Sequence, residues 1–310
     1  MIVQFQLKMG LNHSRNHVMN EYNTRVLGLI QQTRGEDLEQ NLATSIQAIR
    51  SSAEQGAQII CLQELFRSKY FCQTEDSGRF DLAETIPGPT TQTLSQLAKE
   101  LEVVIIAPLF EKRAEGIYHN TAVAINADGS IAGIYRKTHI PDDPCFYEKY
   151  YFTPGDTGFK SFPTRYGRIG VLICWDQWFP EAARLTALSG AQFIFYPTAI
   201  GYQDCDASEL EKQAAAWETI QKSHAIANGV FVAAVNRVGR EGALTFWGRS
   251  FACDPFGKVT AKADENNPEN LIVECNLSDI EQIRQNWPFL RDRRVDAYQK
   301  LIRIYDDPHA

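Results

Sequence analysis

Three reactive side chains stand at the ends of three separate apolar runs. Glu64, Lys137 and Cys174 each come within two residues of the end of such a run, in the segments IICLQE, IAGIYRK and IGVLIC. Open α/β sheets collect their reactive groups at the carboxyl ends of strands. The sequence therefore offers a carboxylate, an ammonium and a thiol, which can serve as general base, electrostatic stabiliser and nucleophile.

Each of these residues also has an ordinary structural interpretation. A lone cysteine such as Cys174 often serves as a small buried hydrophobic residue, while an isolated Glu64 or Lys137 is typical of ion pairs or solvated surfaces. Their shared position at strand ends favours a reactive site instead. A predicted helix begins near Pro180, and a helix N-terminus lowers the pKa of a nearby thiol. We therefore expect the pKa of Cys174 to be lowered.

The composition is that of a folded protein with an acidic surface. The chain has 310 residues, with 31 Lys and Arg against 38 Asp and Glu, so its formal net charge is −7. With 44% apolar residues it can bury a large core, which excludes a disordered or fibrous chain. The negative charge argues against nucleic acid and anionic membranes as main partners, and it is compatible with a cationic ligand.

Several other chemistries lack their sequence patterns. The chain has no zinc-type histidine spacing, no G-x-S-x-G elbow and no glycine-rich dinucleotide or phosphate loop, so we expect no metal and no cofactor. The seven cysteines are scattered and form no C-x-x-C pair, which favours a reducing compartment. The apolar runs are too short to span a membrane, and the N-terminus lacks a signal-type apolar region. We expect a cytoplasmic protein.

Short apolar runs alternate with segments of helical periodicity. The expected strands are 26–30, 57–62, 103–107, 121–125, 131–135, 168–173, 193–196, 230–235 and 271–274. The expected helical segments are 36–56, 91–101, 180–189 and 209–228, with a basic helical stretch around 291–294. Hairpins at Asn126–Ser130 and Asp254–Gly257 add antiparallel pairs, so we predict a layered α/β fold with mixed sheets.

The segments IICLQELF, IYRKTHIPDDP and GVLICWDQWFPEAAR resemble the signature blocks of the nitrilase (carbon–nitrogen hydrolase) superfamily, over about residues 26–300. The resemblance implies an αββα sandwich, with two mixed sheets between helical layers. It also implies a catalytic triad of Glu64, Lys137 and Cys174, a second glutamate at Glu148, and dimers that build larger homo-oligomers.

One domain should carry this site. Glu64 and Cys174 stand about 110 residues apart yet would share one active site, so a domain boundary between them would divide it. We predict a single domain over residues 25–310. The polar residues 1–24 would form an N-terminal extension.

The resemblance implies a task for each residue. Glu64 would take the thiol proton of Cys174, return it to the leaving amine and then activate water. Lys137 would stabilise the tetrahedral oxyanion together with the backbone N–H of Trp175. Glu148 would orient the Lys137 ammonium, and a purely structural ion pair between the two is the open alternative.

Longer stretches such as ELFRSKYFCQ, FYEKYYFTPGDTGF and FYPTAIG resemble the N-carbamoylputrescine amidohydrolase branch of this superfamily. The implied reaction releases putrescine, carbon dioxide and ammonia through a carbamoyl thioester on Cys174. The cationic end of such a substrate needs carboxylates or aromatic faces around it. The residues expected to bind substrate are Trp175, Trp178, Tyr147, Ile200, Asp204 and Asp206, with Glu209 as a further acidic candidate.

Alternatives remain for the backbone near Glu148 and for the activity. Cys145 stands where many relatives have glycine: if the backbone there needs a positive φ, the cysteine is strained, and otherwise the loop adopts a different turn. A second reactive thiol near Glu148 is a further alternative, and a neutral substitution is favoured over it. The alternative enzymes are a β-ureidopropionase, an N-carbamoyl-amino-acid amidohydrolase or an aliphatic amidase. Residues 196–209 contain no Arg or Lys for a substrate carboxylate, which favours a cationic or neutral substrate. A protein without enzymatic activity, such as a catalytically silent scaffold subunit, is the other alternative. The presence of Glu64, Lys137 and Cys174 argues against it.

Overall fold

The computed structural model of the protein describes residues 23–306. Nearly all of the predicted N-terminal extension, residues 1–24, therefore lies outside the described residues. No helix within the described part of the chain is long and apolar enough to cross a membrane.

Two six-stranded sheets form the centre of the molecule. The first sheet has the order β15 (Glu269–Asn276), β1 (Thr24–Gln31), β2 (Ile59–Leu62), β3 (Val104–Ala114), β4 (Ile117–Ile125) and β5 (Ile131–Arg136). The second has the order β14 (Val259–Lys262), β13 (Phe251–Cys253), β10 (Phe231–Val235), β8 (Phe193–Pro197), β7 (Gly167–Val171) and β6 (Ser161–Thr164). Each sheet has parallel strands at its centre and antiparallel strands toward its edges.

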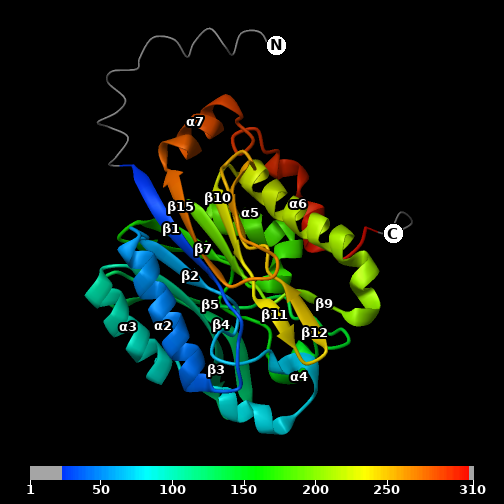
Figure 1. The fold of residues 1–310 in the computed structure, drawn as a ribbon. Helices are drawn as coiled ribbons and strands as arrows, with labels where there is room; N and C mark the ends of the chain where they lie inside the picture. The colour runs from blue at the N-terminus through cyan, green and yellow to red at the C-terminus, as the bar shows by residue number, and fades with distance from the viewer. Residues whose placement is uncertain (1–22, 307–310) are drawn as a thin grey trace.

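Helices cover the outer faces of the two sheets (Figure 1). Within residues 23–306 the α-helices are α2 (Leu38–Glu54), α3 (Pro89–Leu101), α4 (Glu148–Tyr151), α5 (Pro180–Leu188), α6 (Leu210–Asn228) and α7 (Ser278–Asn286). α2 and α3 pack on the first sheet, while α5 and α6 pack on the second. The predicted αββα sandwich with two mixed sheets is confirmed.

The core has two large apolar clusters, of which the first lies between the sheets and continues through the second sheet to α5 and α6. Apolar side chains of both sheets, among them Leu29, Ile106 and Phe195, form one buried cluster between the sheets. A second cluster lies between the first sheet and its helices, where Ile49 and Leu97 meet the sheet. The central strands are buried on both faces, which explains their continuous apolar sequences.

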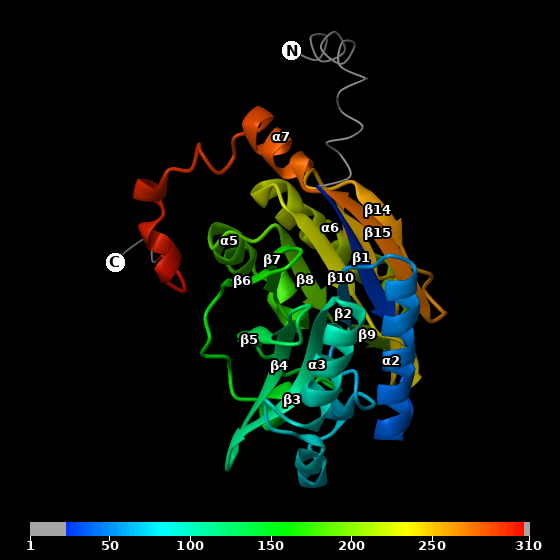
Figure 2. The same ribbon diagram turned by 90° about the vertical axis from the view of Figure 1, so that its left-hand side faces the viewer.

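The structure also corrects parts of the predicted element order. Strands β9 (Gly201–Gln203), β11 (Val238–Glu241) and β12 (Leu244–Trp247) form a third, three-stranded sheet that the sequence did not predict. Such strands of three or four residues are too short for a clear period-two signal. The helical stretch predicted around 291–294 is wrong, because α7 ends at Asn286 and the following segment runs away from the sheets (Figure 2).

Short 3₁₀ turns carry much of the remaining chain. They are η1 (Phe71–Gln73), η2 (Ser77–Leu82), η3 (Cys174–Trp178), η4 (Asp204–Glu209), η5 (Val295–Ala297) and η6 (Gln299–Ile302). Two of them matter for the site. η3 begins at the candidate nucleophile itself, and η4 joins the small sheet to α6.

Gly155 holds the backbone that carries Lys137, so Gly155→Ala should displace the lysine. The Gly155 N–H donates to the Lys137 carbonyl at 2.8 Å, and an added Cβ would lie 2.0 Å from the Arg136 carbonyl oxygen. We expect a loss of stability of about 1–3 kcal/mol, as in other overpacked sites, together with reduced activity. Denaturant unfolding measures the first effect. Gly35→Ala is the control, since the nearest atom to its Cβ would be 3.8 Å away; equal stability of the two variants would contradict the prediction.

Candidate active site

A buried ammonium shared by two carboxylates lies at the strand ends. The Lys137 Nζ lies 2.9 Å from Glu64 Oε1 and 2.6 Å from Glu148 Oε2. All three side chains are at most 1% exposed. The predicted contact between Glu148 and Lys137 is therefore present in the structure.

The two sheets bring these groups together from distant parts of the chain. Glu64 follows β2 and Lys137 follows β5, both in the first sheet, whereas Cys174 follows β7 in the second. Asp176 links the two sides, because its carboxylate accepts hydrogen bonds from the Ile173 N–H at 2.9 Å and the His139 N–H at 3.0 Å. The segment with the nucleophile is thus tied to the segment with the lysine.

Neighbouring polar groups fix the orientation of both glutamates. The Asn120 amide donates to Glu64 Oε1 at 2.7 Å, and the Tyr70 hydroxyl donates to Glu148 Oε1 at 2.7 Å. The other Glu64 oxygen, Oε2, is buried and has no hydrogen-bond partner among the described residues. This oxygen is available to accept a proton, as a general base requires.

Cys174 is buried, and its backbone has the unusual φ of 45°. The expected lowering of its thiol pKa is wrong. Burial raises the pKa well above its usual value, and the negative charge of Glu64 adds to this, while Lys137 opposes it. η3 is only five residues long and begins at Cys174, so its weak dipole does not offset the loss of water. At neutral pH the thiol is protonated and needs a base.

Electrostatic coupling sets the charge of the cluster. Burial opposes the charge on Lys137, but Glu148 and Glu64 together raise its pKa well above the usual range, so the ammonium persists. Burial raises the pKa of Glu148 to about 7; Lys137 opposes this increase, while Glu64 adds to it. The cluster therefore holds one permanent cation, together with a carboxyl group that titrates near neutral pH.

A cavity of about 490 Å³ opens above Cys174 and Glu148. Four of the residues predicted to bind substrate, Trp175, Trp178, Ile200 and Asp206, line this cavity. These four residues, with Cys174 and Glu148 at the base, give the cavity an aromatic and acidic lining. Among the residues that line it there is no Arg or Lys.

Two of the predicted binding residues lie elsewhere. Asp204 does not line the cavity, because its carboxylate forms an exposed bidentate ion pair with Arg240 at 2.8 and 3.0 Å. Tyr147 also does not line the cavity, although its neighbours Phe146 and Glu148 do. The third acidic candidate, Glu209, is exposed and pairs with Lys212 at 3.0 Å.

Sequence reasoning missed several residues of the cavity and its surroundings. Asp143 and Trp247 line the cavity, and Asn120 and Tyr70 hold the glutamates. Asp143 stands in the PDDP end of the predicted lysine block IYRKTHIPDDP, and its carboxyl group was a usable signal. Asn120 and Trp247 come from the distant strands β4 and β12, whereas Tyr70 stands shortly after Glu64; no local pattern marks any of the three.

Cys145, near the cavity, adopts φ 65°, so the strain expected for a cysteine at a glycine-type position is present. Its thiol lies 3.5 Å from the side-chain oxygen of Gln203. Within the described residues, no group of three or more His, Cys, Asp or Glu side chains could hold a metal ion.

The two-sheet sandwich with this carboxylate–ammonium–thiol cluster defines a nitrilase-like α/β enzyme. The family model described as carbon-nitrogen hydrolase matches residues 26–285, and the chain belongs to this family. It is 44% identical to an N-carbamoylputrescine amidase of Solanum lycopersicum over 278 residues, which cover 87% of this chain and 92% of that protein. It is 39% identical to a citrullinase of Francisella tularensis over 288 residues, covering 90% of this chain and 98% of that protein.

A solved structure supports the same assignment. The carbon-nitrogen hydrolase from Helicobacter pylori G27 superimposes with a TM-score of 0.88 at 45% sequence identity, covering 91% of this chain and all of that one. The predicted superfamily is confirmed.

Replacing Glu148 with Gln tests the shared ammonium through its pH dependence. Because the pKa of Glu148 is about 7, the wild-type kcat should rise as pH increases through this value. When Glu148 is ionised, its negative charge partly neutralises the Lys137 ammonium. The ammonium then stabilises the charge on Glu64 less, so Glu64 is a stronger base. Glu148→Gln mimics the protonated state of Glu148. The kcat of this variant should be lower than that of the wild type by about 10²-fold above neutral pH. It should also show no rise as the pH increases through 7.

The measurement is a kcat–pH profile of both proteins, with circular dichroism to verify the fold. A folded Glu148→Gln variant that keeps the wild-type kcat and the same limb would assign Glu148 to a purely structural ion pair.

Proposed function

We propose that this enzyme hydrolyses N-carbamoylputrescine to putrescine, carbon dioxide and ammonia, and that it serves polyamine biosynthesis. The observation that carries the proposal is the buried cluster beneath an acidic, aromatic cavity. One Glu64 oxygen there contacts the Lys137 ammonium, and the other has no hydrogen-bond partner within residues 23–306. The identity with plant N-carbamoylputrescine amidases over most of the chain supports the choice of substrate.

The first half-reaction transfers the carbamoyl group to the enzyme. Glu64 accepts the thiol proton while the Cys174 sulfur attacks the ureido carbon. Lys137 and the Trp175 N–H stabilise the oxyanion of the tetrahedral intermediate. The bond between the carbon and the putrescine nitrogen then breaks, and the proton from Glu64 passes to that nitrogen. Putrescine leaves, and a carbamoyl thioester remains on Cys174.

The second half-reaction restores the enzyme. Glu64 takes a proton from water, whose oxygen attacks the thioester carbon, again beside Lys137. The carbon–sulfur bond breaks, and the thiolate of Cys174 recovers its proton from Glu64. The released carbamic acid decomposes to carbon dioxide and ammonia.

The charge of the cavity favours a substrate with a cationic end. Asp143 and Asp206 are the carboxylates of the lining apart from Glu148, and Trp175 and Trp178 supply aromatic faces. Carboxylates and aromatic faces are the groups that bind an alkylammonium. We propose that Asp206, with Asp143, binds the free ammonium of N-carbamoylputrescine while its methylene chain lies along the tryptophans.

Citrulline is the competing ureido substrate, because a relative is named for it. Its amino-acid end carries a carboxylate beside the ammonium. That carboxylate would find no Arg or Lys among the lining residues and would lie near Asp143 and Asp206. An unpaired charge in such surroundings costs affinity. The same reasoning disfavours N-carbamoyl-amino acids, including N-carbamoyl-β-alanine.

Assembly and compartment remain proposals as well. We propose a homo-oligomer built from dimers, supported by exposed apolar side chains on α5 and in the C-terminal segment, including Leu185, Leu188, Phe289, Leu301 and Ile302. We propose the cytoplasm as its compartment, on the basis of the scattered cysteines.

A steady-state substrate panel tests the proposed function. The panel contains N-carbamoylputrescine, L-citrulline, N-carbamoyl-β-alanine and propionamide, with ammonia release as the signal. We expect the highest kcat/KM for N-carbamoylputrescine, by about tenfold or more over the carboxylated compounds, and no turnover by Cys174→Ala. A preference for a carboxylated substrate, or full activity of Cys174→Ala, would overturn the proposal.

The same panel tests the cation site. Asp206→Asn should raise KM for N-carbamoylputrescine by about twofold to fivefold, the scale of one solvent-exposed charge pair, and leave propionamide unaffected. Asp204→Asn is the matched control, because Asp204 pairs with Arg240 outside the cavity. Equal effects of the two substitutions would contradict the assignment of Asp206.

A further inference from the structure

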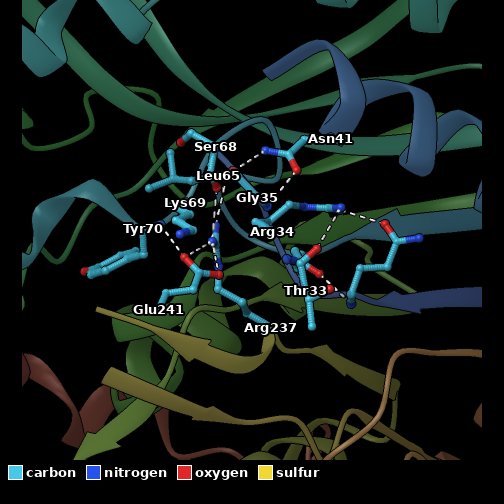
Figure 3. A network of polar contacts seen from close by, with 12 residues as sticks. Thr33, Arg34, Gly35, Asn41, Leu65, Ser68, Lys69, Tyr70, Arg237 and Glu241 are labelled. Carbon is cyan, nitrogen blue, oxygen red and sulfur yellow. Dashed lines mark hydrogen bonds and ion pairs between the residues drawn. The ribbon is translucent and has the colours of Figure 1, made fainter. Parts of the chain in front are cut away.

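A buried arginine–glutamate pair lies behind the active site and takes no part in the proposed chemistry. Arg237 follows β10 and is fully buried, and Glu241 at the end of β11 is 2% exposed. The Arg237 Nη1 lies 2.8 and 2.9 Å from the two Glu241 carboxylate oxygens. Neither residue lines the cavity above Cys174. Figure 3 shows the pair and the segment that it contacts.

Arg237 binds the main chain that carries Glu64. Its Nη2 donates to the carbonyl oxygens of Glu64 at 2.9 Å and Leu65 at 3.0 Å, while its Nη1 donates to that of Ser68 at 3.0 Å. One guanidinium thus fixes three carbonyl groups in the segment that begins at the general base. The planar fork of an arginine can span such a set of acceptors, whereas a lysine ammonium cannot.

This segment has a reason to need such support. Leu65, directly after Glu64, adopts φ 50°, a left-handed conformation that is unfavourable for leucine. Such a conformation persists only when the surrounding structure enforces it. The contact between Arg237 and the Leu65 carbonyl supplies part of that enforcement.

Glu241 extends the same support to the second glutamate. Its Oε2 accepts a hydrogen bond from the Tyr70 N–H at 2.7 Å, as Figure 3 shows. The hydroxyl of Tyr70 in turn donates to Glu148 Oε1 at 2.7 Å. A continuous series of contacts therefore runs from the buried pair to both carboxylates that share Lys137.

We propose that Arg237 and Glu241 are positioning residues that set the geometry of Glu64 directly and of Glu148 through Tyr70. The inference rests on the proposed function of the Glu64–Lys137–Cys174 cluster. The pair acts on the rate of the chemical steps and not on substrate binding, since it lies outside the cavity. A displacement of about 1 Å at a catalytic group can cost about 10²-fold in rate.

Arg237→Lys tests the first half of the inference with the charge retained. Removing Arg237 or Glu241 entirely is a poor test. Arg34 is a second buried arginine near Arg237, and Glu241 is the negative charge that both arginines face. Removing either partner would therefore leave buried charge unbalanced. In Arg237→Lys the three carbonyl contacts cannot all form, so we expect kcat to fall by about 10²-fold and KM to change by less than about twofold. Arg284→Gln is the matched control. Arg284 also donates to a main-chain carbonyl, that of Asn228, but at the opposite end of β10; its kcat should be unchanged.

Tyr70→Phe tests the second half and preserves the shape of the side chain. The hydroxyl favours the ionised form of Glu148, because it donates to the carboxylate. Its removal should lower kcat and move the acidic limb of the pH profile to higher pH.

The readouts distinguish this inference from the proposed function. Wild-type turnover of N-carbamoylputrescine tests the function, and the ratio of variant to wild type, measured on any panel compound that the wild type hydrolyses, tests the positioning. A folded Arg237→Lys variant with wild-type kcat, or one that changes only KM, overturns the inference. If Arg237→Lys does not fold, the Tyr70→Phe variant provides the test. A Tyr70→Phe variant whose kcat rises over the same pH range as that of the wild type overturns the inference.

Discussion

The structure depends on one buried ammonium that two buried carboxylates share. Withdrawing three charges from water costs several kcal/mol per ion, and only close geometry with further hydrogen bonds repays that cost. Lys137 lies within 2.9 Å of both glutamates, and Asn120 and Tyr70 satisfy one oxygen on each. One Glu64 oxygen is left without a hydrogen-bond partner in the described part of the chain. The arrangement is therefore stable enough to persist and still has one reactive position.

The fold explains how this cluster is assembled. Strand ends of two facing sheets supply Glu64, Lys137 and Cys174, and Asp176 joins the two sides. Because the cysteine is buried beside a carboxylate, its pKa is raised and it is protonated at rest. In the proposed mechanism catalysis then begins with proton transfer to Glu64, because a protonated thiol is a weak nucleophile.

The strands and the three reactive residues could be predicted from the sequence, because each reactive residue stands close to its strand along the chain. An apolar run ends within two residues of each of Glu64, Lys137 and Cys174, so one local pattern indicates both the strand and the reactive residue. Glu148 was predicted from the family resemblance alone. Other contacts could not be predicted because they depend on a residue that is distant in the sequence. Asp204 stands within residues 196–209, where an acidic contact to the substrate was expected, but it pairs with Arg240, 36 residues away. The Arg237 contacts cross more than 160 residues, and no local pattern marks them.

The central claim is that Cys174 carries the carbamoyl group between the two half-reactions. The direct measurement is rapid chemical quench of the enzyme during turnover of N-carbamoylputrescine, followed by peptide mass spectrometry. The account predicts a carbamoyl adduct on the peptide that contains Cys174, formed together with the first equivalent of putrescine. Continued turnover with no adduct on Cys174, or with the adduct on another cysteine such as Cys145, would contradict it.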